Sequence, residues 1–204
     1  MTTCCKSYNI GTVLLTQERA GKMKEIRIHA RAGQGAITTA ALLGFAYFKE
    51  GKYPYAFPNF GAARMGAPMN AFVRVDAKPV RLRSQIYEPD YVIIVDPTLM
   101  RGYNCFSGLK ENGIAIINGT KDSEIPKLNA KQKAFVVPAN EIALKTIGRP
   151  LANTTLIGAY AAATGELKLE TLFEVVKARF SGKALEGNIE AIKQGFEFVK
   201  KQLK

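Results

Sequence analysis

The stretch KEIRIHARAGQGAITTAALLGFAYFK, residues 24–49, decides the fold. Its first part, Lys24–Ala30, alternates apolar and polar side chains with both isoleucines on one face, which is typical of a strand. A glycine turn follows at Arg31–Ala36, and Ile37–Lys49 then has a helical period. The apolar positions at that spacing are Ile37, Ala40, Ala41, Gly44, Phe45 and Phe48. A strand, a glycine turn and a helix in this order predict an α/β fold.

Further strands and helices are expected downstream. The predicted strands are Met69–Val75, Pro79–Arg83, Tyr91–Val95, Ile114–Ile117 and Phe135–Val137, the first two forming a hairpin around Asp76–Lys78. Tyr53–Pro68 is rich in Pro, Gly and aromatic residues, and we expect an ordered loop or an interrupted strand there. The predicted helices are Glu141–Ile147, Asn153–Thr164, Leu169–Phe180 and Leu185–Leu203.

These elements predict a three-layer α/β/α arrangement, a single Rossmann-like domain with a helical C-terminal third. The domain is expected to span residues 24–204. Residues 1–23 differ from the rest and are expected to be a poorly ordered N-terminal extension, and Met23 is a candidate natural start.

The chain is basic, with 29 Lys and Arg against 17 Asp and Glu and a net charge of +12. Such a balance favours an acidic partner: a nucleic acid, a polyanionic cofactor or an acidic subunit. The segment from Lys49 to Arg83 contains seven basic residues and two acidic ones, so its net charge is +5. Nowhere do Lys and Arg form the block typical of a nucleic-acid arm, so we expect no nucleic-acid partner. No window approaches 18 apolar residues, so we expect no membrane span and a cytoplasmic protein.

Cysteine and histidine are scarce, which limits the metal chemistry. The cysteines are Cys4, Cys5 and Cys105, too few for a disulfide framework, so we infer a reducing compartment. Three thiols cannot supply the four ligands of an iron–sulfur cluster. His29 is the only histidine, which excludes a His-rich zinc site. No metal site is predicted.

The strongest binding candidate is the turn Gly33-Gln34-Gly35. Glycines between a strand and a helix let backbone N–H groups approach an anion, and the helix dipole favours negative charge there. The alternative is a tight turn that simply requires positive φ. Arg64, among small residues in GAARMGAP (61–68), is a second candidate, because its guanidinium can grip a phosphate or carboxylate as a fork. The alternative is a solvated loop arginine.

Other polar side chains have ordinary explanations. Arg74, Arg81 and Arg83 alternate with apolar residues and are expected on one wet sheet face. His29, on the polar side of the first strand, is expected at the surface or an interface. Asp96 follows an apolar strand, where α/β folds place ligand groups, or it caps the next turn. No catalytic motif is present, so the chain is not expected to hold a self-sufficient active site and no catalytic residue is assigned.

Four motifs in order resemble one family. They are IRIHARAGQGAITTAALL (26–43), AFPNFGAARMGAPMNAFVRV (56–75), RLRSQIYEPDYVIIVD (81–96) and GRPLANTTLIGAYAAATG (148–165). Together they resemble the γ subunit of 2-oxoacid:ferredoxin oxidoreductases, the pyruvate type most closely, from Lys24 to about Lys201. The chain departs from the family pattern at Ala30 and Ala32, where the family has glycines, and at Ala62-Ala63, where a charged residue often precedes the arginine.

The resemblance implies a supporting subunit in an oxidoreductase complex of anaerobic metabolism. In that family, α and β subunits hold thiamine diphosphate with magnesium, and a ferredoxin-like δ subunit adds 4Fe–4S clusters that pass electrons to ferredoxin. The γ subunit packs on the thiamine-binding core and helps to form the coenzyme A site. By this resemblance Gly33, Gln34, Gly35 and Arg64 are the expected coenzyme contacts, and the chain alone holds no cofactor. The alternative is a stand-alone nucleotide- or phosphate-binding α/β domain.

Overall fold

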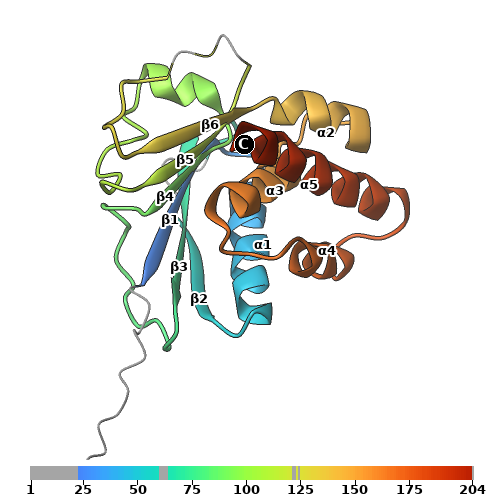
Figure 1. The fold of residues 1–204 in the computed structure, drawn as a ribbon, viewed down its shortest axis with the longest axis horizontal. Coiled ribbons are helices and arrows are strands. Elements are labelled where there is room, and N and C mark those ends of the chain that lie inside the picture. The colour runs from blue at the N-terminus through green and yellow to red at the C-terminus, as the bar shows by residue number, and fades with distance from the viewer. Residues whose placement is uncertain (1–22, 60–63, 121–122, 124, 204) are drawn as a thin grey trace, which may run out of the picture.

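The structure is a computed structural model that describes residues 23–59, 64–120, 123 and 125–203. The expected N-terminal extension therefore lies outside the described residues, apart from Met23. A six-stranded sheet forms the centre of the molecule, in the order β2-β3-β1-β4-β5-β6 (Figure 1). The strands are β1 (Lys24–Arg31), β2 (Tyr53–Asn59), β3 (Pro68–Asp76), β4 (Tyr91–Ile94), β5 (Ile114–Asn118) and β6 (Lys133–Val137).

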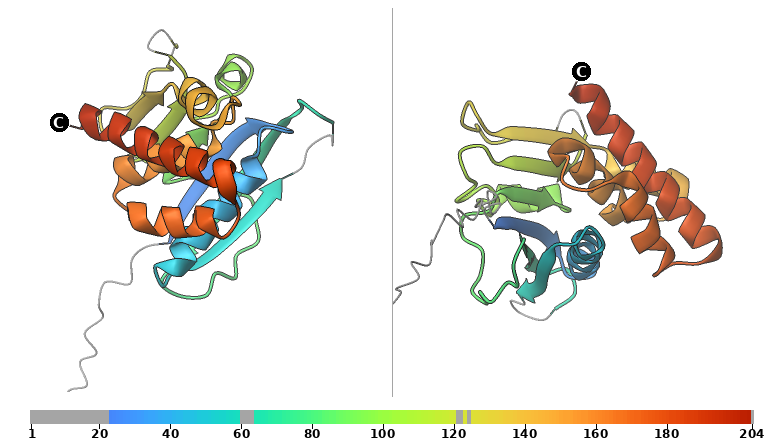
Figure 2. Two further views of the ribbon diagram at one scale, coloured as in Figure 1. Left: turned by 90° about the vertical axis from the view of Figure 1, so that its right-hand side faces the viewer. Right: turned by 60° about the horizontal axis from the view of Figure 1, so that its bottom comes forward.

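Strand direction divides the sheet into two parts. Strands β1, β4, β5 and β6 run parallel, whereas β3 is antiparallel to both of its neighbours, β1 and β2. The α-helices gather on one face of the sheet (Figure 2). They are α1 (Ala36–Lys49), α2 (Ala139–Ile147), α3 (Asn153–Thr164), α4 (Leu169–Lys177) and α5 (Gly182–Gln202). The predicted α/β fold and the helical C-terminal third are confirmed.

The opposite face of the sheet is covered differently from the predicted layering. A 3-10 helix, η1 (Pro97–Arg101), and irregular segments at 77–90 and 102–113 lie there in place of α-helices. Leu99, Cys105 and Leu109 of this layer pack on the apolar side chains of β4 and β5.

Helix α1 packs on the sheet through a different stripe from the one that the apolar spacing suggested. Its buried side chains are Ala36, Thr39, Ala40, Leu42, Leu43, Ala46 and Tyr47. Ile37, Phe45 and Phe48 point outward and are 43%, 39% and 61% exposed. The small residues of the buried stripe allow the helix to lie close to the strands.

The segment between α1 and β4 differs most from expectation. Tyr53–Asn59 is a regular strand that pairs antiparallel with β3, so this part is a strand and not a loop, and residues 60–63, where an interruption would fall, lie outside the described residues. The predicted strand Pro79–Arg83 is wrong, because these residues are irregular. Their neighbour Arg74 is buried and donates to the carbonyls of Leu82, Ser84 and Gln85, which holds the segment as a loop.

Candidate functional site

The glycine turn lies at the carboxyl edge of the parallel strands, between the end of β1 and the start of α1. Gly33 and Gly35 adopt φ angles of +95° and +80°, which confirms the expected need for left-handed backbone. The N–H of Gln34 donates to the carbonyl of Arg31 at 3.0 Å and closes the turn. Helix α1 then begins with no side-chain cap, so its first N–H groups are left for water or a ligand.

The side chain of Gln34 holds the turn together. Its Oε1 accepts from the N–H of Arg31 at 2.8 Å, and its Nε2 donates to Asp96 Oδ2 at 2.7 Å. Asp96 also caps η1 by accepting from the N–H and hydroxyl of Thr98, and Arg31 Nε lies 3.2 Å from its Oδ2. Asp96 therefore caps the next turn, as one of its two readings predicted, and its place at the carboxyl edge leaves the ligand-group reading a prediction.

Opposing effects set the charge state of Asp96. Burial by itself would raise its pKa, but hydrogen bonds from Thr98 and Gln34 and the charge of Arg31 lower the pKa below its ordinary value. The carboxylate therefore stays ionised at neutral pH and keeps the turn anchored to β4.

Asn153, at the start of α3, supports the turn from the helical side. This buried amide donates to the carbonyls of Gln34 and Gly35 at 3.0 and 2.8 Å and to Thr39 Oγ1 at 3.0 Å. A Cβ at position 35 would overlap the Asn153 amide, so glycine is required there for space as well as for φ.

The loop of Arg64 lies directly on the glycine turn. Ala32 exchanges two backbone hydrogen bonds with this loop, donating to Ala67 at 2.8 Å and accepting from Gly66 at 3.0 Å. Met65 covers Gly33 so closely that a Cβ there would stand 2.6 Å from the Met65 sulfur. Arg64 itself is exposed. The structure thus brings the four predicted site residues into one region.

A cavity of about 760 Å³ opens beside the turn, lined by Gly33 and Gly35. Its cationic lining consists of Arg149, Arg179 and Lys183, and none of its lining residues is acidic. Leu42, Ile147, Leu151 and Phe180 give it an apolar wall.

Three helices begin at this cavity. Gly35 precedes α1, Asn153 opens α3, and Lys183 lies in the first turn of α5, and none of these helices has a side-chain cap. Each helix start carries a partial positive charge. The C-terminal end of α2, at Ile147 and Gly148, also lines the cavity and carries the opposite partial charge, so the three cations are the main feature that makes this cavity, hereafter the basic pocket, suited to a polyanion.

The sequence did not single out the cations of the basic pocket. Arg149 lies within a quoted motif, GRPLANTTLIGAYAAATG, but was not proposed as a site residue. Arg179 and Lys183 flank the break between two helices, around Gly182, and a search of helix junctions for basic residues could have found them. Their convergence with residue 33 depends on the packing of α3 against α5, which no local pattern encodes.

His29 is buried on the face of the sheet opposite the α-helices, in contrast to the expected surface or interface position. Arg27 Nε donates to His29 Nε2 at 3.1 Å, so the proton of the neutral ring sits on Nδ1. Burial and then the charge of Arg27 lower the pKa of His29 to about 4. The ring is therefore neutral near pH 7.

This depressed pKa predicts a pH dependence of stability. The unfolded chain takes up the His29 proton below about pH 6.5, whereas the folded chain does so only near pH 4, so stability falls as the pH falls through that window. We expect His29 to lower the free energy of unfolding by about 2 kcal/mol between pH 7.5 and pH 5. Urea unfolding at both pH values measures the loss, and His29→Gln should show a loss smaller by that amount. Equal losses in both proteins would contradict the assignment.

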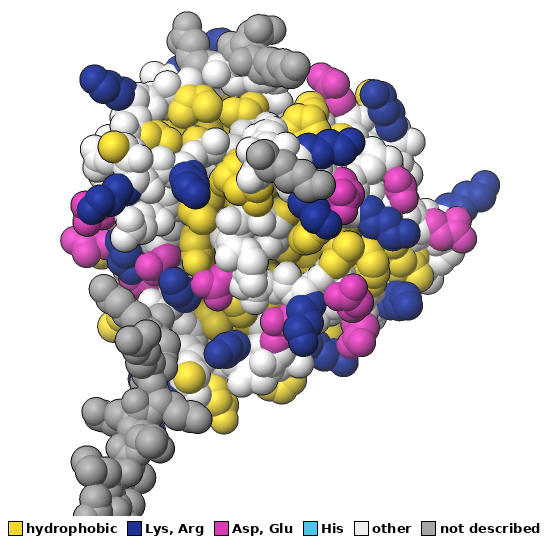
Figure 3. Space-filling model, viewed as in Figure 1, with side chains coloured by type: hydrophobic (Ala, Val, Ile, Leu, Met, Phe, Trp, Pro, Cys, Tyr) yellow, Lys and Arg dark blue, Asp and Glu magenta, His cyan; other side chains and the backbone are white. Residues whose placement is uncertain are grey.

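Outside these sites, the visible face of the molecule has no continuous basic surface, and the described residues form no metal-ligand cluster (Figure 3). Lys and Arg are scattered among Asp and Glu on the face shown in Figure 3, with no continuous basic band. Among the described residues, no group of three or more His, Cys, Asp and Glu side chains could hold a metal ion, and no helix is long and apolar enough to cross a bilayer.

Comparison with known proteins identifies the family. A family model described as "Pyruvate ferredoxin/flavodoxin oxidoreductase" matches residues 25–198. The "Pyruvate/ketoisovalerate oxidoreductases common subunit gamma" of Pyrococcus abyssi is 48% identical over 86% of this chain and 96% of that protein. The "Pyruvate synthase subunit PorC" of Methanosarcina barkeri is 49% identical over 76% of this chain and 86% of that protein.

A solved structure gives the same answer. The crystal structure of pyruvate oxidoreductase subunit PORC from Thermotoga maritima superimposes with a TM-score of 0.77 at 37% identity, covering 87% of this chain and 97% of that one. The glycine turn, its anchors and the basic pocket thus sit on the fold of a γ (PorC) subunit, and the chain belongs to the pyruvate ferredoxin/flavodoxin oxidoreductase family.

Proposed function

We propose that this chain is the γ subunit of a pyruvate:ferredoxin oxidoreductase complex and that its glycine turn and basic pocket hold the phosphates of coenzyme A. The observation that carries the second half is the convergence of three uncapped helix starts and three cationic side chains on one acid-free cavity. Coenzyme A carries a pyrophosphate and a 3′-phosphate, so it matches a polyanion site.

The turn and its neighbours contribute different groups to such a ligand. The first N–H groups of α1, after Gly35, donate to phosphate oxygens, and Arg149 and Arg179 supply charge. Arg64, exposed on the adjoining loop, lies at the margin of the same region. The amide of Gln34 is committed to Asp96 and Arg31, so its part is to shape the turn.

The remaining cofactors are assigned to other chains. Cys105 is the one described cysteine, and no acidic cluster among the described residues suits magnesium, so the residues present do not fit a cluster or a thiamine diphosphate site. We propose that α and β subunits hold thiamine diphosphate with magnesium, and that a ferredoxin-like δ subunit with 4Fe–4S clusters passes electrons to ferredoxin. Thiamine diphosphate supplies the decarboxylation chemistry, and this chain positions the acyl acceptor. The free thiol of Cys105 suits a reducing, cytoplasmic location.

The test is the coenzyme A dependence of the assembled complex carrying the double variant Arg149→Ala/Arg179→Ala. A charged hydrogen bond contributes about 1.5–3 kcal/mol, so we expect the KM for coenzyme A to rise roughly 10- to 150-fold with kcat nearly unchanged at saturating coenzyme A. These side chains are exposed, so the complex should still assemble, which light scattering verifies. They are better probes than Gly33, whose substitution would collide with Met65.

Arg81→Ala is the matched control, because Arg81 is an exposed arginine outside the basic pocket. It should leave the KM for coenzyme A unchanged. An intact complex with the double variant and an unchanged KM would refute the coenzyme A site while leaving the γ-subunit assignment in place. Failure of the chain to co-purify with thiamine-binding subunits from its native source would refute that assignment.

A further inference from the structure

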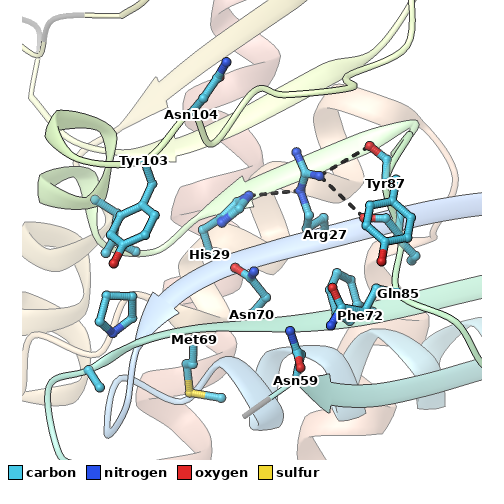
Figure 4. Close-up of a pocket in the computed structure, with 14 residues that line it drawn as sticks. Arg27, His29, Asn59, Met69, Asn70, Phe72, Gln85, Tyr87, Tyr103 and Asn104 are labelled. Atoms are coloured by element: carbon cyan, nitrogen blue, oxygen red, sulfur yellow. Dashed lines mark hydrogen bonds between the residues drawn. The ribbon is translucent and has the colours of Figure 1, made fainter. Parts of the chain in front are cut away.

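A second cavity, of about 520 Å³, lies on the face of the sheet that the α-helices leave uncovered. Its floor is formed by β1 and β3, through His29, Asn70 and Phe72 (Figure 4). Its rim comes from the two irregular segments of that face, with Tyr87 on one side and Tyr103 on the other. We call this cavity the amide pocket.

The amide pocket has a neutral polar lining. Four residues with carboxamide side chains line it, Asn59, Asn70, Gln85 and Asn104, of which Asn104 already accepts from the N–H of Phe106. Within the part of the chain that the structure describes, no hydrogen bond engages the side-chain amides of Asn59 and Gln85. No acidic residue lines the cavity.

The two ionisable groups of the lining offer a ligand little charge. His29 is held neutral by its burial and then by the charge of Arg27, which lower its pKa. Arg27 is itself enclosed, 8% exposed, and its guanidinium donates to backbone carbonyls of Cys105, Ser107, Ile86 and Tyr87. The pocket therefore presents hydrogen-bond donors and acceptors together with one enclosed guanidinium whose donors are already engaged, which suits a polar ligand that carries no positive charge.

The rim adds aromatic surface. Tyr87 and Tyr103 are 70% and 57% exposed, although tyrosine rings generally bury their faces where they can. Exposed rings beside a hydrogen-bonding floor are the usual means by which proteins stack a nucleobase.

We infer that the amide pocket binds the adenine ring of a nucleotide. A carboxamide presents a donor and an acceptor side by side, the complement of the N6 amino group and N7 of adenine, and Asn and Gln are the side chains that read adenine in this way. Guanine is read by a free arginine fork, and the fork of Arg27 is already occupied by carbonyls. The adenine would belong either to coenzyme A or to a separate adenine nucleotide, and the chemistry of recognition is shared. The coenzyme A alternative rests on the proposed function, whereas adenosine binding itself does not depend on the proposed phosphate site.

The test uses the full chain and adenosine, which has no phosphate for the basic pocket to attract. Saturation-transfer NMR titration should show saturable binding of adenosine, at least about fivefold tighter than that of guanosine, because one bidentate base contact contributes about 1–3 kcal/mol of discrimination. Tyr103→Ala should weaken adenosine about 5- to 150-fold, the loss of one stacked base. Gln85→Ala, which removes a free carboxamide at the exposed rim, should also weaken it.

The matched control is Tyr53→Ala, because Tyr53 is an exposed tyrosine, 47% accessible, outside the amide pocket. It should leave adenosine binding unchanged. Competition then identifies the source: displacement by coenzyme A but not by 4′-phosphopantetheine assigns the adenine to the coenzyme, and adenosine binding undisturbed by coenzyme A assigns it to a separate nucleotide. Absence of saturable adenosine binding would overturn the inference. Equal adenosine binding by wild type and Tyr103→Ala would also overturn it, even if Tyr103→Ala impaired assembly with other subunits.

Discussion

Gly158→Ala is expected to destabilise the protein by on the order of 3 kcal/mol. Gly158 lies on α3, and a Cβ there would overlap the carbonyl oxygen of Ile192 on α5. The approach is reciprocal, since a Cβ on Gly195 of α5 would overlap the carbonyl of Thr155. Backbone cannot turn aside as a side chain can, so the two helices must separate and lose their packing. The cost must also exceed the gain of about 1 kcal/mol that alanine brings to a helix interior.

Gly44→Ala is the matched control, because Gly44 is also helical but its added Cβ would stand an ordinary 3.4 Å from Ala56 Cβ. It should leave stability unchanged or raise it slightly. Urea unfolding of both variants measures the difference. A Gly158→Ala protein as stable as the Gly44→Ala protein would show that α3 and α5 are not in backbone contact.

Local patterns were enough for most of the fold. The alternation in β1, the apolar run of β4 and the glycine-bounded helices after Pro138 all depend on neighbours in sequence, and their predicted strands and helices are confirmed with small shifts at the ends. The layering depended on long-range packing. Nothing local distinguishes a connection that packs as irregular chain, such as 77–90, from one that forms a helix on the sheet.

The candidate site also has features that local sequence predicts and features that only long-range contacts create. The glycine turn was visible because Gly33 and Gly35 form a strand-to-helix junction, a local signature. The role of Gln34 was not visible, since its partner Asp96 is 62 residues away and only the parallel pairing of β1 with β4 brings the two together. The same holds for Arg149 and Arg179, which come together only in the folded chain. It also holds for the carboxamides of the amide pocket.

Arg74 is the clearest case in which sequence pattern misled. Its alternation with apolar neighbours in β3 predicted a wet sheet face, yet the side chain is 1% exposed. Nε lies 2.9 Å from Glu25 Oε1, and the guanidinium also donates to the carbonyls of Ser84 and Gln85. A period of two assigns a residue to a face but does not say what covers that face, and here the 77–90 segment does.

Arg74→Met should therefore lower the free energy of unfolding by about 3–5 kcal/mol, the usual cost of removing one partner from a buried ion pair. Glu25 would be left without its guanidinium, although Lys110 lies 3.6 Å from its Oε2, and the carbonyls near residue 84 would lose their donors. Urea unfolding measures the loss, and hydrogen exchange should show protection falling first in the 77–90 segment. Arg81→Met, at an exposed arginine of that same segment, should cost less than about 0.5 kcal/mol. Similar losses in the two variants would mean that Arg74 is as solvated as its alternation suggests, and that the loop is held over the sheet by something other than its guanidinium.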